Sequence, residues 1–249
     1  MSSLAIEKVY SSLSELGRFF RFVYQLFITL PYKRGVKEQV IYLGLGSLPI
    51  VVMAALLTGF IATWQVNYIA GDMGGMTLLG MMVMKVVFSE LGPTLIGLVL
   101  AGRIGAKVSA EVGSMRVTEQ IDAYTVLSLE PLRYIVTPRV YGALITMPIL
   151  FIYGSLTAIV SSQVLATLVF GLPMSQFYSS MREGFDGYQI VIGFVKSSSF
   201  SLLTILISTY YGFYASGGAV GVGRATRSAV VVSTIAILIM NFFVSKVML

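Results

Sequence analysis

Long uninterrupted apolar runs limit what this chain can fold into more than any other feature. Several reach the roughly 20 residues that a helix needs to cross the hydrocarbon core of a bilayer. Only 11% of the residues are charged, whereas a soluble domain usually carries about 25%. We therefore predict an all-α polytopic membrane protein, a single domain over 1–249 with five transmembrane helices. The predicted spans lie at about 40–64, 78–106, 140–169, 189–214 and 228–249.

Residues 1–35 precede these spans and are amphipathic. Apolar side chains recur at spacings of three to five from Leu4 to Phe27, and charged residues fall between them. This pattern favours a helix that lies in the membrane interface, with Arg18 and Arg21 towards anionic headgroups. The alternative is an ordinary amphipathic helix packed on the bundle. In either case we expect Pro31 to end it.

Lysine and arginine residues concentrate on one side of this topology. Thirteen of them lie in the N-terminal tail, the 103–139 segment and the 215–227 loop, while the two loops on the other side hold only Arg182. Basic residues accumulate in the cytoplasmic loops of membrane proteins. We therefore expect a cytoplasmic N-terminus and a C-terminus on the opposite side of the membrane.

The composition excludes most catalytic equipment. The chain has no cysteine and no histidine, so neither a Cys/His nor a Ser/His/Asp set can form. It has no Gly-x-x-x-x-Gly-Lys-[Ser/Thr] phosphate loop, and its acidic residues show no metal-ligand spacing. The glycine-rich stretch with Gly221, Gly223 and Arg224 follows a membrane helix, so we interpret it as a tight turn at the start of the last helix. We expect no catalytic residue and no metal site.

Three ionisable residues, Lys85, Glu90 and Lys196, fall inside the predicted spans, more than three residues from either end. Such residues are costly in hydrocarbon and usually face a partner or a wet cavity. We predict that Glu90 and Lys196 line a central polar cavity at a subunit interface. Pro93 and Gly97 belong to the same candidate cavity. Two alternatives remain open, a structural ion pair and a Lys196 that snorkels to the outer interface.

The segment 111–133 is charged and amphipathic, unlike the spans on either side of it. Its apolar residues recur with helical spacing up to Pro131. We predict a short cytoplasmic helix, ended by Pro131, that docks in a groove on a soluble partner and passes its movement into the bundle. The alternative is a solvated surface helix without a partner. The candidate coupling residues are Glu111, Met115, Thr118, Glu119, Gln120, Ile121, Asp122 and Arg133.

Several blocks, occurring in order along the chain from about Lys37, resemble the MlaE family of lipid-transporting ABC-transporter permeases. One departure is Asn241, where many relatives have an aspartate in the last span. The blocks are Glu90-Leu-Gly-Pro93, Ala101-Gly-Arg103-Ile-Gly105, Val117-Thr118-Glu119-Gln120-Ile121-Asp122, Pro131-x-Arg133-Tyr134, Pro138-Arg139, Ile192-Gly-Phe-Val-Lys196 and Gly221-Val-Gly223-Arg224.

The resemblance implies two copies of this chain around a lipid-sized cavity. It also implies a separate ABC ATPase subunit, which holds ATP and Mg²⁺ and docks on the helix with Glu119 and Gln120, and an MCE-type periplasmic lipid-binding protein. Phospholipid is the implied cargo, moved between the inner and outer membranes of a diderm bacterium, with this chain in the inner membrane. No cofactor on this chain and no nucleic-acid partner are expected. The alternatives are a sterol or other hydrophobic cargo, an ion-coupled secondary transporter that uses Lys85, Glu90 and Lys196 as a relay, and a structural membrane anchor.

Overall fold

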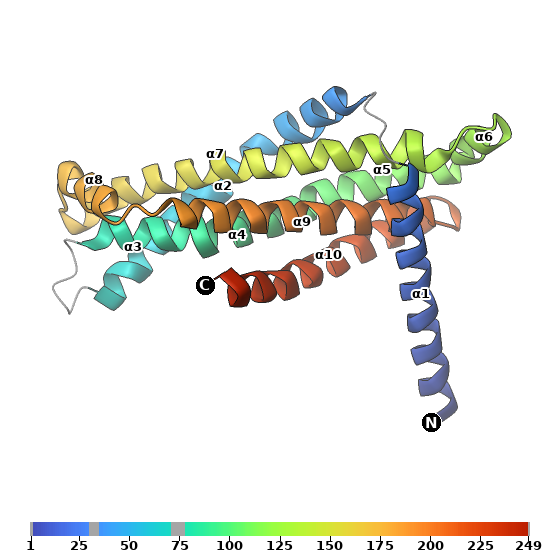
Figure 1. Ribbon diagram of the computed structural model, residues 1–249, viewed down its shortest axis with the longest axis horizontal. Coiled ribbons are helices and arrows are strands. Elements are labelled where there is room, and N and C mark those ends of the chain that lie inside the picture. Colours follow the sequence, from blue (N-terminus) through green and yellow to red (C-terminus); the bar gives the residue numbers. More distant parts are fainter. Residues whose placement is uncertain (1, 30–34, 71–77, 249) are drawn as a thin grey trace.

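The chain forms an elongated helical bundle with one further helix placed crosswise at its end (Figure 1). The computed structural model describes residues 2–29, 35–70 and 78–248. Among these residues, five helical stretches are long and apolar enough to cross a membrane, which confirms the predicted number of spans. They are Val36–Ile69, Leu79–Val117, Leu132–Phe170, Gly187–Phe213 and Gly218–Met248.

Three spans are single helices and two are composite. The single ones are α2 (Val36–Ala70), α9 (Gly187–Phe213) and α10 (Gly218–Met248). The second span contains two π-helical turns and consists of α3 (Leu79–Val86), η3 (Val87–Leu91), α4 (Gly92–Leu100), η4 (Ala101–Gly105) and α5 (Ala106–Val117). The third consists of η5 (Leu132–Val136) and α7 (Thr137–Phe170), and the remaining helices are α1 (Ser2–Thr29), α6 (Gln120–Val126) and α8 (Met174–Glu183). π-Helical turns are rare and occur frequently at functional sites.

Helix α1 crosses the end of the bundle at which α6 lies, and its N-terminus projects away from the spans (Figure 1). Its C-terminal half is fixed by Phe22 and Leu26, each 1% exposed. The Phe22 ring lies 5.6 Å from the Tyr210 ring and 5.8 Å from the Phe213 ring of α9. The predicted N-terminal helix is therefore present, and its second half packs on the bundle. The expected break at Pro31 lies outside the described residues.

Near α6 the second and third spans are longer than the sequence indicated. The second continues to Val117 instead of ending near residue 106, and the third begins at Leu132 instead of 140. The extension of α5 is stable because Val108 and Val112 are fully buried, and α5 packs on both α9 and α10. The predicted 215–227 loop is also shorter, since α10 already begins at Gly218.

The prediction of one coupling helix that ends at Pro131 is wrong. Glu111 and Met115 belong to α5, and only Gln120–Val126 form the separate helix α6. The backbone breaks at Glu119, whose φ of 60° is left-handed, and again at Ser128, whose φ is 57°. Pro131 stands before η5 and starts a helix, because proline lacks the N–H that a first turn leaves unused.

A very close helix contact joins α2 and α7 at Gly59. A Cβ atom built at Gly59 would lie 2.0 Å from Ser161 Oγ and 2.1 Å from the Ala158 carbonyl oxygen. Ser161 Oγ donates to the Leu56 carbonyl at 3.1 Å, and Ser162 Oγ donates to the Gly59 carbonyl at 3.0 Å. Small residues and hydroxyl donors are the usual means by which helices associate in lipid.

Replacing Gly59 with alanine is therefore expected to separate α2 from α7. Overpacking of this kind costs about 1–3 kcal/mol, and the midpoint of thermal unfolding in detergent should fall accordingly. Gly102 is a suitable control, because a Cβ atom there would meet nothing within 4 Å. Equal loss of stability in Gly59→Ala and Gly102→Ala would contradict the assignment of this contact.

Candidate functional site

An ion pair lies inside the bundle between the second and fourth spans. Lys196 Nζ of α9 is 2.7 Å from Glu90 Oε1 of η3, and the Lys196 side chain is fully buried while that of Glu90 is 35% exposed. Lys196 also donates to the Ser89 carbonyl oxygen at 2.7 Å. Ser245 Oγ of α10 donates to Glu90 Oε1 at 2.9 Å. The Glu90 carboxylate thus connects the second, fourth and fifth spans.

The local sequence explains why a lysine can be accommodated at this point. Pro93 has no backbone N–H, so the helical turn before it lacks one donor for its carbonyl groups. The Lys196 ammonium supplies a donor to that turn at Ser89. Close approach of α9 depends on Gly193, where a Cβ atom would lie 2.4 Å from the Phe88 carbonyl oxygen.

The other candidate cavity residues have different surroundings. Pro93 and Gly97 are buried, and a Cβ atom at Gly97 would lie 2.9 Å from the Phe200 ring. In the single chain these two residues therefore lie in packed helix contacts, and a cavity between two copies stays a prediction. Lys85 is exposed, and the ion pairs found among the described side chains do not include it.

A second ion pair joins the ends of the second and third spans beneath α6. Arg139 of α7 donates to Glu111 Oε1 of α5 at 2.5 Å and to the Ile135 carbonyl oxygen at 2.5 Å. The same guanidinium lies 3.7 Å from Met115 Sδ. The Arg139 side chain is 7% exposed and that of Glu111 is 34% exposed. The Glu111–Arg139 pair therefore ties the end of α5 directly to the start of α7.

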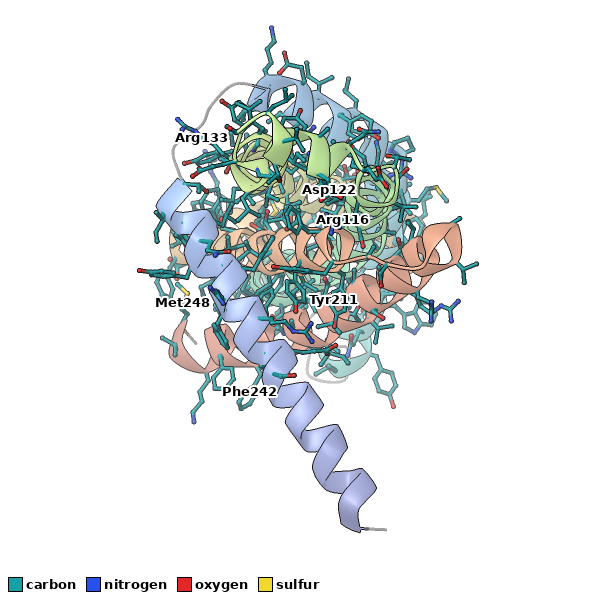
Figure 2. All side chains as sticks on the ribbon, turned by 90° about the vertical axis from the view of Figure 1, so that its right-hand side faces the viewer. Arg116, Asp122, Arg133, Tyr211, Phe242 and Met248 are labelled. Atoms are coloured by element: carbon teal, nitrogen blue, oxygen red, sulfur yellow. The ribbon has the colours of Figure 1, made fainter. Side chains whose placement is uncertain are left out.

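Helix α6 forms the tip of the bundle at this end (Figure 2). Arg116 of α5 pairs with Asp122 at 2.5 Å, and Gln120 Nε2 donates to Thr118 Oγ1 at 3.0 Å. Ile121 is 2% exposed and anchors the helix in the core. Glu119 lies at the turn itself, where its left-handed backbone directs α6 away from α5.

The C-terminal end of α6 carries apolar residues that no described part of the chain covers. Val126 is 84% exposed and Leu127 is 69% exposed. Arg133 is also exposed at this end of the molecule, and it lies at a distance from the Arg116–Asp122 pair (Figure 2). Exposed apolar groups rimmed by polar ones mark interaction surfaces. The tip thus combines a short helix anchored by Ile121 with an exposed apolar edge.

Comparison with known proteins places this arrangement in a family. The family model described as Permease MlaE matches residues 36–247. The chain belongs to the MlaE permease family. A probable ABC transporter permease protein of Rickettsia prowazekii is 35% identical over 209 residues, which cover 84% of this chain and 81% of that protein. A probable ABC transporter permease protein of Synechocystis is 33% identical, with 87% and 82% covered.

A relative from a plant is also similar. The chloroplastic protein TRIGALACTOSYLDIACYLGLYCEROL 1 of Arabidopsis thaliana is 36% identical over 165 residues, or 66% of this chain and 47% of that protein. The chain is therefore a multi-pass membrane permease subunit of the ABC transporter type, and this type of permease implies an ATPase partner. Among the described residues of this MlaE permease, no group of three or more acidic side chains could hold a metal ion.

Three side-chain contacts of the MlaE permease were not visible in its sequence. Ser245, which contacts Glu90, is 155 positions away from it, and no local pattern relates the two. Asn241, where the resemblance led us to expect an aspartate, accepts at its Oδ1 a hydrogen bond from Thr94 Oγ1 at 3.1 Å. An amide oxygen can accept this bond as a carboxylate would, so a polar contact between α4 and α10 is present. Arg139 lies in a recognised motif, but its pairing with Glu111 depends on the fold.

Close packing requires glycine at Gly221, in the first turn of α10. A Cβ atom at Gly221 would lie 1.8 Å from the Ser216 carbonyl oxygen, whereas one at Gly223 would meet nothing within 4 Å. Gly221 is buried and Arg224 is exposed. The close approach at Gly221 lets α10 begin immediately after α9.

Proposed function

We propose that this chain is the membrane subunit of an ATP-driven phospholipid transporter that moves lipid between the inner and outer membranes of a diderm bacterium. Residues 1–249 act as one permease domain, and two copies enclose the lipid path. The observation that carries the proposal is the tip at α6, a short helix anchored by Ile121 with the exposed apolar residues Val126 and Leu127. An ABC ATPase, which holds ATP and Mg²⁺, docks on this tip.

The contacts beneath α6 support a route from the ATPase to the membrane interior. Displacement of α6 is passed to α5 by the Arg116–Asp122 pair and from α5 to α7 by the Glu111–Arg139 pair. The second span contains two π-helical turns, η3 and η4, between α5 and Glu90. π-Helical turns occur frequently at functional sites, and we assign to these two the movement that alters the Glu90–Lys196 region.

Two observations support a phospholipid path between two copies. The windows of α2 and α10 that would lie in the membrane are only 22% and 17% buried within one chain, against 56% for the other spans. These outer faces are available to lipid or to a second copy. The name of the Arabidopsis relative contains a glycerolipid, trigalactosyldiacylglycerol, which supports a diacylglycerol-based cargo.

The proposed orientation places α1, α6 and the α9–α10 turn on the cytoplasmic side of the inner membrane. The basic residues gather at this end, and the crosswise position of α1 suits a helix in the interface. The C-terminus then lies in the periplasm, where an MCE-type lipid-binding protein receives or delivers the cargo.

One observation favours a second candidate function. A buried Lys196 paired with a carboxylate in the membrane is the type of group that carries protons in secondary transporters. An ion-coupled transporter of a hydrophobic or small solute is therefore the alternative. It would work without an ATPase.

Co-purification from native membranes tests the ATPase interface. The variant Glu119→Ala/Gln120→Ala should lose the bound ATPase by more than tenfold, because a few central side chains supply most of an interface's binding free energy. The matched control is Gln176→Ala/Glu183→Ala on α8, at the opposite end of the bundle. Co-extracted phospholipid is measured by mass spectrometry in the same samples. If wild type purifies without any ATPase, the proposal fails.

A further inference from the structure

Two adjoining cavities lie between α1, α9 and α10, far along the chain from Glu90. The first has a volume of about 320 Å³ and is polar, with Glu15 and Arg18 of α1, Tyr210, Tyr211 and Tyr214 at the end of α9, and Arg224 of α10 in its wall. Its volume reaches the lower end of the range for small-molecule sites, about 300–1,000 Å³. In Figure 2 Tyr211 is seen beside α1 at this end of the bundle.

The charges in this cavity favour an anion. Arg18 and Arg224 come from different helices and converge on the same cavity. Neither takes part in an ion pair among the described side chains. Glu15 is the one acidic residue in the described wall, so the cavity carries a net charge of +1. Arginine offers a planar fork of donors that matches the oxygens of a phosphate group.

The geometry of the α9–α10 turn brings Arg224 back towards the cavity. A Cβ atom built at Gly217 would lie 3.3 Å from Arg224 Nη2, so the guanidinium is folded over this turn. Gly217 has a φ of +89°, a conformation that glycine adopts without strain. The Arg224 side chain, although exposed, therefore lies against this turn and in the wall of the cavity.

The second cavity has a volume of about 380 Å³ and is mostly apolar. Its wall contains Leu16, Phe19, Leu203, Ile207, Val232 and Ala236. It shares the wall residues Glu15, Tyr210 and Tyr211 with the polar cavity, so the two cavities adjoin. A basic cavity beside an apolar one matches an amphiphilic ligand, which has an anionic headgroup and an apolar chain.

We propose that the two cavities hold one anionic phospholipid, with its phosphodiester between Arg18 and Arg224 and an acyl chain along α9 and α10. Free phosphate would satisfy the arginines but would leave the apolar compartment without an occupant. A phospholipid with one net negative charge neutralises the cavity. Because it contacts both α1 and the bundle, the lipid holds the crosswise helix in place. The site is separate from the Glu90–Lys196 pair, and it requires neither ATP nor a partner chain.

Binding of phosphatidylglycerol to the purified chain in detergent micelles tests the proposal, with native mass spectrometry as the readout. The variant Arg18→Gln/Arg224→Gln should bind phosphatidylglycerol at least about tenfold more weakly, because each charge-assisted hydrogen bond contributes substantially to the binding free energy. The matched control is Arg21→Gln/Arg227→Gln, which removes two arginines of the same two helices that are likewise exposed but lie outside the walls of both cavities. Equal losses in both variants would mean general surface attraction and would overturn the proposal.

Two further arms separate a lipid from free phosphate. Ala236→Phe fills the apolar cavity and should weaken binding of phosphatidylglycerol, while Val231→Phe, on an exposed face of α10, should not. Neither inorganic phosphate nor glycerol 3-phosphate should compete with the lipid at millimolar concentration. Competition by either anion, together with unchanged binding in Ala236→Phe, would show a free-phosphate site and refute the lipid proposal. Circular dichroism confirms that each variant is folded, and the outcome is independent of ATPase binding.

Discussion

Replacing Glu90 with glutamine should lower the free energy of unfolding by about 3–5 kcal/mol, the cost of breaking a buried ion pair by removing one partner. The side chain of Lys196 is fully buried. In the variant its ammonium group would keep only the hydrogen bond to the Ser89 carbonyl oxygen and a contact with the neutral glutamine amide. Ser245 would also lose a charged acceptor. The measurement is the midpoint of thermal unfolding of the purified protein in detergent, followed by circular dichroism.

Substitution of the other partner of the ion pair, Lys196, provides the comparison. Lys196→Met should destabilise less than Glu90→Gln, because the Glu90 side chain is 35% exposed and keeps its hydrogen bond from Ser245. The double variant Glu90→Gln/Lys196→Met should recover part of the loss, since neither charge remains buried without its partner. If the effects of the two single substitutions simply add, the ion pair does not stabilise the fold.

Replacing Glu111 with methionine should cost about 2–3 kcal/mol, within the range for a hydrogen bond to a charged group. Arg139 cannot lose its proton, and its side chain is 7% exposed, so water compensates poorly for the missing carboxylate. The variant should still bind the ATPase. Because the pair joins α5 to α7, however, ATP hydrolysis should be coupled less well to transport.

Glu130→Met is the control for this prediction. Glu130 is exposed at the same end of the molecule, so its replacement changes the surface charge equally without removing the contact with Arg139. Unfolding midpoints and ATPase rates of the reconstituted complex are compared for the two variants. Equal behaviour of both would mean that the Glu111–Arg139 pair neither stabilises nor couples the two spans.

The spans could be predicted because their signal is local. A run of apolar residues such as 140–169 specifies a membrane helix whatever lies beside it, and the structure confirms it within Leu132–Phe170. The residues at which the spans begin and end could not be predicted in the same way. Ala106–Val117 has little apolar character of its own, and it is helical because α9 and α10 bury Val108 and Val112.

The candidate residues were predictable as types but not as contacts. A charge within an apolar run singled out Glu90 and Lys196, and the fold brings them within 2.7 Å. The same signal singled out Lys85, which the fold leaves exposed. The left-handed backbone at Glu119 could not be foreseen, because that conformation is uncommon for a residue other than glycine. It divides the expected coupling helix at the point where α6 turns away from α5.

The most direct test of the proposed function is phospholipid transfer by this chain reconstituted in liposomes with its ATPase and periplasmic partner. Movement of a fluorescent phospholipid is followed with ATP, without ATP, and with ionophores that remove every ion gradient. We predict transfer that requires ATP hydrolysis and persists in the presence of ionophores. Transfer by the chain alone, driven by an ion gradient and abolished by ionophores, would contradict the ATP-driven mechanism and establish the secondary transporter.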